Sequence, residues 1–137
     1  MFTHQRTLRL GDTDAAGVVY FASLLSICHE TYEAFLDDRQ LSLAQLLTAG
    51  EWGLPIVHAE IDFWRPLRCG DRLNIQLHLH HLSQQGFTSQ YQLSKQDDPD
   101  VWVARAQLEH VCVVRSLGRK GDLPPQWLAV LQAWADD

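Results

Sequence analysis

The sequence has few cysteines, more acidic than basic residues and no long hydrophobic run. Its 137 residues include three cysteines, Cys28, Cys69 and Cys112, which are far apart and form no Cys-x-x-Cys pair. This spacing argues against a disulfide framework or a zinc knuckle and favours reduced thiols in a cytoplasmic protein. The formal net charge of -6 argues against general binding to nucleic acid or to anionic lipid, because both require a basic surface.

Targeting signals and internal repeats are not visible in the pattern either. Residues 1–10 alternate polar and apolar side chains without the apolar core of a signal peptide, so we expect none. We expect no membrane span, because no apolar run approaches the necessary length. The composition, 46% hydrophobic and 20% charged, is ordinary for a soluble globular protein and predicts a single domain over residues 1–137.

The hydrophobic pattern predicts a strand, a long helix and then several strands. Residues 2–10 alternate as a first strand. From residue 21 the apolar side chains recur at spacings of four and three, which predicts a helix that ends near residue 38. A short second helix over residues 41–49 is expected to stop at Gly50.

The second half of the chain predicts an antiparallel meander and a C-terminal helix. Turn-forming residues at 85–86 and 97–100 separate the later strands. A helix is expected to begin at the two prolines 124–125. One long helix followed by long strands indicates the α+β class, with a sheet curled around the helix. The four expected strands cover residues 54–64, 71–83, 87–95 and 101–115.

Two carboxylates stand just before the long helix, in residues 11–20, which read GDTDAAGVVY. A carboxylate beside a helix N-terminus can attack a carbonyl that the helix end polarises, or can activate water against it. This pattern favours hydrolysis, and thioester hydrolysis in particular. The structural alternative is that Asp14 only caps a turn, while Asp12 is expected to be a turn residue or a partner of Arg6 or Arg9.

Residues 11–20 resemble the signature loop of the hot-dog-fold thioesterases of the 4-hydroxybenzoyl-CoA thioesterase family. Residues 65–71, RPLRCGD, resemble the second marker of that family, a turn between two strands. The resemblance covers nearly the whole chain in element order and length. It implies a hot-dog fold, in which a curled antiparallel sheet wraps a long central helix. It also implies dimers joined at their sheet edges, a homotetramer built from dimers, and active sites shared between two subunits.

The resemblance also implies roles for single residues. Asp14 matches the catalytic carboxylate, which acts as nucleophile or as general base, and no metal or cofactor is needed. The backbone N–H of Phe21 matches the main oxyanion donor, and Gly17 allows the tight bend of the loop. Phe21 replaces the His of the Tol-Pal-associated thioesterases, which fits a branch that handles aromatic acyl groups. The alternative is that Phe21 belongs to the core.

Within the family, the pattern is most similar to the 1,4-dihydroxy-2-naphthoyl-CoA hydrolases of phylloquinone biosynthesis. This resemblance implies that the chain cleaves this thioester to the free acid and coenzyme A. Another aromatic or a short-chain acyl-CoA would be a second enzyme reading. A non-catalytic module that binds acyl-CoA or an acyl-carrier protein is the alternative from another functional class. A hydratase with the same fold is disfavoured, because the sequence has no matching His/Asp hydratase loop.

Candidate binding residues lie on both sides of the expected reaction centre. Tyr20 and Trp64 are assigned to the acyl group, because aromatic walls suit a bicyclic ring. His58 is assigned to a substrate hydroxyl or to the shape of the pocket, with a structural role as the alternative. The aromatic candidates, of which one or two are expected to touch the substrate and the rest to lie in the core or an interface, are Trp52, Phe63, Trp64, Phe87 and Trp102. The phosphates of coenzyme A require Arg or Lys, and residues 115–121 form the densest basic segment, with Arg115, Arg119 and Lys120. Arg65 and Arg68 form a second basic turn, and ordinary surface charge is the alternative for both.

A row of histidines on one expected strand raises the question of a metal site. His78 and His80 should share one face of that strand, with His81 beside them. No acidic or cysteine partner has ligand spacing nearby, so a solvated sheet face is the preferred interpretation.

Overall fold

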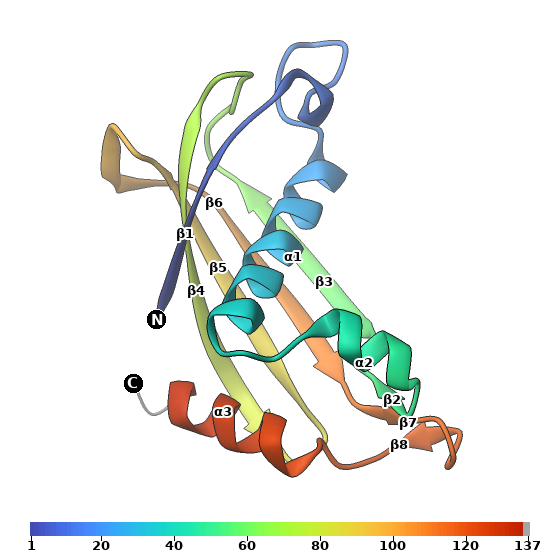
Figure 1. Ribbon diagram of the computed structural model, residues 1–137. Coiled ribbons are helices and arrows are strands. Elements are labelled where there is room, and N and C mark those ends of the chain that lie inside the picture. The colour runs from blue at the N-terminus through green and yellow to red at the C-terminus, as the bar shows by residue number, and fades with distance from the viewer. Residues whose placement is uncertain (136–137) are drawn as a thin grey trace.

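The computed structural model describes residues 1–135, so the last two residues of the expected 1–137 domain lie outside the described part. The chain begins with a strand and a single turn of 3-10 helix, continues into a long helix and a short one, and then runs through consecutive strands to a C-terminal helix (Figure 1). The helices are η1 (Leu10–Asp12), α1 (Phe21–Asp38), α2 (Leu43–Ala49) and α3 (Pro125–Ala135). The strands are β1 (Phe2–Thr7), β2 (Trp52–Gly53), β3 (Ile56–Phe63), β4 (Arg72–Ser83), β5 (Gly86–Lys95), β6 (Asp98–Val111), β7 (Val113–Val114) and β8 (Arg119–Lys120).

The main sheet has five antiparallel strands in the order β1-β4-β5-β6-β3. The expected meander is therefore correct for β4, β5 and β6 but wrong for β3, which pairs with β6 at the sheet edge instead of with β4. Strand β3 carries His58, Glu60 and Asp62 at alternate positions, and charged side chains of this kind suit an edge that faces solvent.

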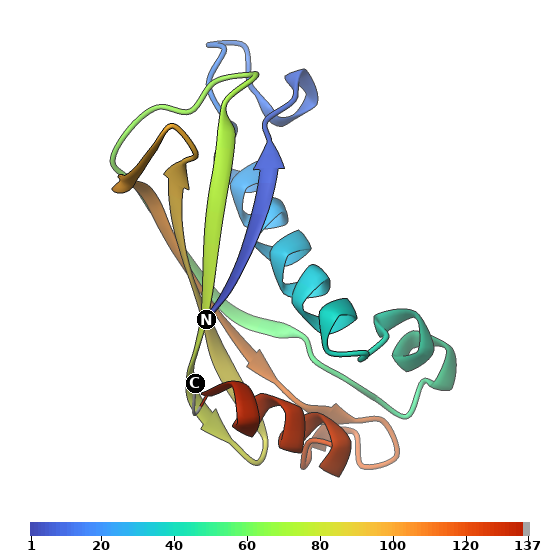
Figure 2. The ribbon, with the colours of Figure 1, turned by 60° about the vertical axis from the view of Figure 1, so that its left-hand side comes forward.

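Helix α1 lies along the concave face of the curled sheet (Figure 2). Its buried face includes Ile27, Cys28, Tyr32 and Phe35. On the sheet, alternate residues of β4 are buried, among them Ile75. The expected helix, its end and the curled α+β sheet are confirmed. The first predicted residue of the apolar face, Phe21, is an exception because its side chain is 56% exposed.

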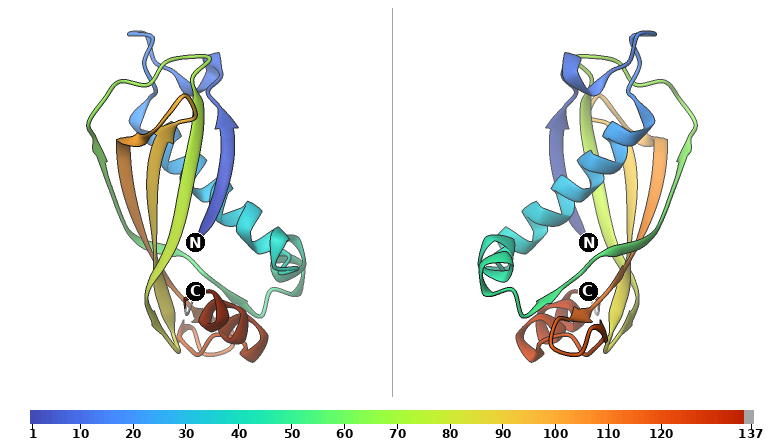
Figure 3. Two further views of the ribbon diagram at one scale, coloured as in Figure 1. Left: turned by 90° about the vertical axis from the view of Figure 1, so that its left-hand side faces the viewer. Right: turned by 90° about the vertical axis from the view of Figure 1, so that its right-hand side faces the viewer.

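The smaller elements gather at the end of the molecule opposite the N-terminus of α1 (Figure 3). Helix α2 is capped by Ser42, whose side chain accepts the N–H of Gln45 at 3.1 Å, and it ends at Gly50 in a left-handed conformation, φ 65°. The expected strand over residues 101–115 divides at Cys112, because β7 leaves the main sheet to pair with β2 and β8. None of the helices described within residues 1–135 is long and apolar enough to cross a membrane.

One buried histidine lies in the core between α1 and the sheet. The ring of His110 stacks on Phe87 with centroids 4.7 Å apart, and its Nε2 lies 3.2 Å from the hydroxyl of Ser89. Tyr32 of α1 packs against the same ring. Burial, together with the charge of His29, lowers the pKa of His110 to about 4, so the folded protein holds this residue neutral at pH 7.

Candidate active site

The loop before α1 holds Asp14 at the start of a tight turn. The N–H of Asp14 donates to the carbonyl of Val18 at 2.9 Å, and the N–H of Gly17 donates to the carbonyl of Asp14 at 3.0 Å. Gly17 closes the turn with φ 80°, a backbone conformation that residues with a side chain rarely adopt. The Asp14 carboxylate accepts the N–H of Ala16 at 2.8 Å and remains exposed.

The neighbouring carboxylate, Asp12, anchors the loop. It forms a two-pronged ion pair with the guanidinium of Arg6 and accepts the N–H of Arg9 at 2.8 Å. Arg6 also reaches Glu30 of α1 at 3.2 Å, so one guanidinium joins β1, the loop and the helix. The hydrogen bond from Arg6 lowers the pKa of Asp12. The predicted structural role of Asp12 is confirmed, with Arg6 as its ion-pair partner.

The first turn of α1 faces the loop with unpaired donors. The N–H of Tyr20 is already taken by the carbonyl of Asp12 at 2.9 Å. The N–H groups of Phe21 and Ala22 have no protein acceptor within residues 1–135. Free donors at a helix N-terminus stabilise negative charge, and the helix dipole adds to this effect.

The two sequence markers meet in space. Val18 bridges to Arg68, and the N–H of Val19 donates to the carbonyl of Leu67 at 2.7 Å. The contact places the turn at residues 65–71 against the loop that carries Asp14. Residues of both segments line one open cavity of about 440 Å³, a size typical of small-molecule sites. The lining residues are Asp14, Val18, Val19, Tyr20, Phe21, Phe63, Trp64, Arg65 and Pro66.

One carbonyl explains why four consecutive residues line the cavity. Side chains of a regular strand alternate between two faces, so neighbours in sequence normally point apart. Here the carbonyl of Val103 accepts the N–H of Trp64 at 2.9 Å and that of Arg65 at 3.2 Å. Because two consecutive N–H groups share this carbonyl, the regular pairing of β3 ends at Phe63, and residues 63–66 all line the cavity with Asp14.

The cavity is largely apolar, with one acidic and one basic side chain in its lining. Phe21 and Tyr20 lie with ring centroids 4.8 Å apart, and Phe63 and Trp64 come from the other wall. Arg65 makes no ion pair with any residue in the described range 1–135. The lining therefore brings together a carboxylate, a residue with a free main-chain donor, Phe21, and several aromatic side chains.

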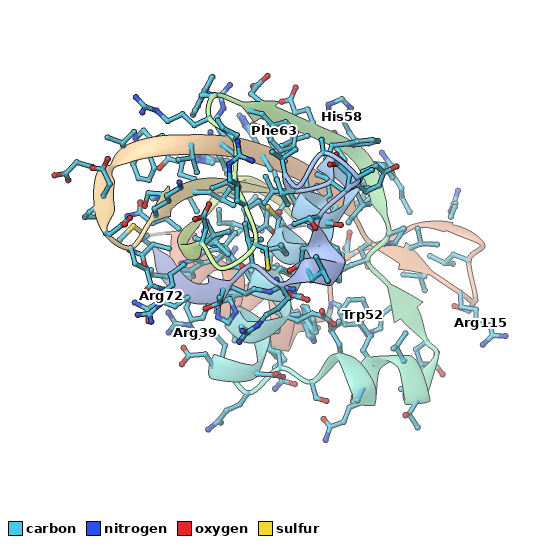
Figure 4. All side chains as sticks on the ribbon, turned by 90° about the horizontal axis from the view of Figure 1, so that it is seen from above. Arg39, Trp52, His58, Phe63, Arg72 and Arg115 are labelled. Atoms are coloured by element: carbon cyan, nitrogen blue, oxygen red, sulfur yellow. The ribbon has the colours of Figure 1, made fainter. Side chains whose placement is uncertain are left out.

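Some expected site residues lie elsewhere in the chain. His58 projects from β3 beside Glu60, with Nε2 3.9 Å from the carboxylate, and does not line the cavity. Arg115, Arg119 and Lys120 belong to the β7–β8 segment at the opposite end of the molecule (Figures 1 and 3). Figure 4, seen from above, shows His58 and Phe63 along β3 and Arg115 on the projecting β7–β8 hairpin.

Two residues of the cavity lining were not predicted from the sequence, Val18 and Pro66. They lie there beside the expected Tyr20 and Trp64 and beside Phe63, one of the aromatic candidates. The position of Pro66 inside the second marker was a usable signal. Trp52 instead packs edge-on against Trp127 with centroids 4.9 Å apart.

Two histidines of β4, His78 and His80, lie on the face of the sheet opposite its buried Leu77. His78 and His80 share that face, as expected, with ring centroids 6.4 Å apart. His80 contacts Gln90 at 2.7 Å. Across the described part of the chain, no group of three or more His, Cys, Asp or Glu residues is arranged to hold a metal ion.

Comparison with known proteins gives consistent matches over nearly the full chain. The model of the thioesterase-like superfamily matches residues 8–134. A 1,4-dihydroxy-2-naphthoyl-CoA hydrolase of Gloeothece citriformis is 48% identical over 132 residues, which is 94% of this chain and 92% of that protein. A protein of the same name from Synechococcus elongatus is 46% identical over 136 residues, which is 98% of both chains.

The solved structures agree with the sequence relatives. The crystal structure of a 1,4-dihydroxy-2-naphthoyl-CoA thioesterase from Synechocystis superposes with a TM-score of 0.89. It is 41% identical in sequence, and the match covers 99% of this chain and 96% of that chain. This chain therefore belongs to the thioesterase-like superfamily.

Proposed function

We propose that this protein hydrolyses 1,4-dihydroxy-2-naphthoyl-CoA to the free acid and coenzyme A, a step of phylloquinone biosynthesis. One observation carries the chemistry: the Asp14 carboxylate and the Phe21 residue with its free N–H line the same aromatic cavity. The acyl identity is supported by relatives of that name at 48% and 46% identity over most of the chain.

The proposed reaction uses main-chain donors on one side of the thioester carbonyl and Asp14 on the other. The N–H of Phe21 donates a hydrogen bond to the carbonyl oxygen as negative charge develops there, and the dipole of α1 adds to this stabilisation. Removal of one such donor typically costs about 3 kcal/mol in the barrier. Gly17 contributes through the turn that positions the carboxylate, and no metal or cofactor takes part.

Asp14 has two chemically balanced routes. As a nucleophile it bonds to the carbonyl carbon, the C–S bond breaks, and the coenzyme A thiolate leaves and takes a proton. Water then hydrolyses the resulting mixed anhydride to the acid and regenerates the carboxylate. As a general base it removes a proton from water, and the hydroxide attacks the carbonyl carbon. The C–S bond then breaks, and the coenzyme A thiolate leaves and takes the proton from Asp14. Both routes need the same carboxylate beside the thioester carbonyl, in contact with its carbon in the first route and with the attacking water in the second.

The aromatic wall favours a flat acyl group. Phe63, Trp64, Tyr20 and Phe21 all line the cavity, and stacking on aromatic rings stabilises a bicyclic substrate. A non-catalytic binding module would need neither the carboxylate nor the free donors, so the combination supports an enzyme. A thioesterase for another aromatic acyl-CoA keeps the same machinery and is the second candidate.

The experiment is a panel of acyl-CoA thioesters assayed by release of the free thiol. The 1,4-dihydroxy-2-naphthoyl thioester should have a higher kcat/KM than benzoyl-, 4-hydroxybenzoyl- and acetyl-CoA. Strong turnover of short acyl groups with none of the naphthoyl thioester would exclude the proposed substrate. Hydrolysis of none of them would exclude the enzyme.

We further propose that this single-domain protein forms a homotetramer, a dimer of dimers, in the cytoplasm. Strand β3 pairs only with β6, so its outer edge carries backbone groups without a strand partner in the described chain. Such an edge favours pairing with a second copy. The acidic composition supports neither nucleic acid nor membrane partners. Light scattering that gives the mass of a monomer would contradict this assembly.

A further inference from the structure

Arg6 joins three segments of the chain beside the candidate site. It lies in β1, which runs alongside α1 and leads into the loop of Asp14 (Figures 1 and 2). Its guanidinium forms the two-pronged ion pair with Asp12, in which Nη2 lies 3.2 Å from Oδ1. Nε donates to the carboxylate of Glu30 at 3.2 Å, and Nη1 donates to the carbonyl of Thr7 at 3.1 Å. Every nitrogen of the guanidinium therefore has an acceptor, and the side chain is only 21% exposed.

Asp12, the partner of Arg6, closes the base of the loop. Its carbonyl accepts the N–H of Tyr20 at 2.9 Å, so this bond joins the two ends of the loop. Asp14 follows Asp12 by two residues on one side of the closure, and Phe21 follows Tyr20 directly on the other side. The orientation of Asp12 therefore sets the position of the Asp14 carboxylate relative to the N–H of Phe21.

The main-chain bond from Asp12 also sets where the free donors of α1 begin. The N-cap residue, Tyr20, makes no capping hydrogen bond with its side chain, whereas the hydroxyl of Ser42 caps α2. A Ser, Thr, Asp or Asn in the place of Tyr20 would accept an N–H of the first helical turn. Because the Asp12 carbonyl takes only the N–H of Tyr20, the donors that remain free start at Phe21.

A guanidinium suits this task better than another cation would. Forked, charge-assisted pairs are shorter and stronger than neutral hydrogen bonds, and they fix orientation as well as distance. Arg6 also holds the helix through Glu30, which follows Phe21 by nine residues, or roughly 14 Å along the axis of α1. One rigid planar group therefore fixes the loop and the body of the helix to each other.

We infer that Arg6 is a positioning residue for thioester hydrolysis, which by way of Asp12 holds the Asp14 carboxylate and the Phe21 N–H at their working separation. This role rests on the proposed function. Arg6 is not among the described residues that line the cavity, so it acts on the reaction through Asp12 and not by touching the substrate. Orientation of this kind affects the transition state more than the binding of the substrate, so its loss appears in kcat.

The first test separates kcat from KM. Arg6→Gln should lower kcat for the dihydroxynaphthoyl thioester about tenfold to a hundredfold, because a misplacement of about 1 Å costs this much in rate. KM should change less than about threefold, since the lining of the cavity is unchanged. Arg6→Lys keeps the charge but loses the fork, so it should lower kcat too, and it decides the question if Arg6→Gln does not fold. A folded variant of either kind with the kcat of the wild type would overturn the inference.

Two comparisons distinguish positioning from a loss of stability. Arg39 is the matched control at the other end of α1, with its guanidinium 3.8 Å from the Asp38 carboxylate and over the ring of Phe35. Arg39→Gln should lower the melting temperature and leave kcat unchanged. The double variant of Arg6→Gln and Asp14→Asn should be much faster than the product of the two single losses predicts, because orientation matters little once the carboxylate is gone. An equal loss of kcat in Arg39→Gln, or single losses that multiply fully, would overturn the positioning role.

A third measurement, hydrogen exchange followed by NMR, needs no hydrolysis. In the wild type the N–H of Tyr20 is bonded to Asp12 and should exchange slowly, whereas the free N–H of Phe21 should exchange fast. Arg6→Gln should speed exchange at Tyr20 about tenfold or more and leave the hydrogen-bonded N–H of Cys112, at the other end of the molecule, unchanged. Unchanged exchange at Tyr20 would reject the role of Arg6 whether or not the protein is a hydrolase. Faster exchange in a protein whose wild type hydrolyses no thioester would reject the proposed function and keep Arg6 as the residue that fixes the loop.

Discussion

The carboxylate of Asp14 accepts a hydrogen bond from the N–H of Ala16, 2.8 Å away, so the turn that carries the side chain also orients it. Asparagine keeps an oxygen for this contact but loses the charge. Asp14→Asn should therefore fold normally and lower kcat by about 10³-fold, within the range typical of a missing base or nucleophile. Thiol release measures the loss, and a thermal melt is the control. Hydrolysis at the wild-type rate would remove Asp14 from the mechanism.

Asp12 should matter for stability, because its carboxylate is held by Arg6 and by the N–H of Arg9. Asp12→Asn leaves the Arg6 guanidinium with a weaker partner and should cost about 2 kcal/mol of unfolding free energy. Urea denaturation measures this change. Asp62→Asn is a matched control, since its pair with Arg105 at 3.5 Å is exposed and should contribute less than about 1 kcal/mol. Equal losses in both variants would contradict the anchoring role.

Gly17 and Gly11 form a matched pair of glycines in the same loop. A Cβ at either position would meet nothing within 4 Å, but Gly17 alone has a left-handed backbone, φ 80°. Gly17→Ala should therefore lose about 1 kcal/mol of stability through backbone strain, and kcat should fall as the turn shifts. Gly11→Ala should leave both quantities near the wild-type values. Urea denaturation measures the stability and the thiol assay measures kcat. A larger loss in Gly11→Ala than in Gly17→Ala would contradict this role of Gly17.

The buried His110 makes stability depend on pH. The unfolded chain binds a proton at this ring below about pH 6.5, whereas the folded protein resists it until about pH 4. Between these values the unfolded state holds more protons, so the unfolding free energy falls as the pH falls, by about 3 kcal/mol in total. Urea melts from pH 7 to pH 4 measure the slope. His110→Phe should flatten it in this window, and an equally steep slope in the variant would exclude His110 as the cause.

Trp64 should affect the choice of substrate more than the stability of the fold. Its side chain is 53% exposed in one chain and lines the cavity. Trp64→Ala should lower kcat/KM for the dihydroxynaphthoyl thioester about tenfold, because a stacking wall is lost. Acetyl-CoA, which has no ring to stack, should respond less. A similar loss for both thioesters would argue against a wall role for Trp64.

The sequence predicted α1 well because a long helix must bury a continuous stripe, and that stripe repeats every three or four residues. The same periodicity placed Phe21 on the apolar face, yet this side chain is exposed. The spacing of apolar residues shows which side chains share a face of the helix, but not how far along the helix the sheet covers that face. Phe21 lies in the first helical turn, where the cavity replaces the core.

Order along the chain could not predict order within the sheet. Strand β3 reads as the neighbour of β4, because they are consecutive, but it pairs with β6 across the register that sets Ile61 opposite Ala106. The cavity wall was hidden for a similar reason, because it depends on a carbonyl of Val103, some 40 positions from Trp64 in sequence. The loop at Asp14 could be predicted from a local motif, because its hydrogen bonds join residues that are close in sequence.

The shared carbonyl of Val103 has a practical consequence for altering acyl selectivity. It accepts two main-chain N–H groups, so neither bond depends on the identity of the side chains at residues 63–65. Those side chains can be exchanged to reshape the ring slot while the hydrogen-bonded ladder stays in register. Redesign toward larger or smaller acids therefore has a natural starting segment, one that the hydrophobic core does not constrain.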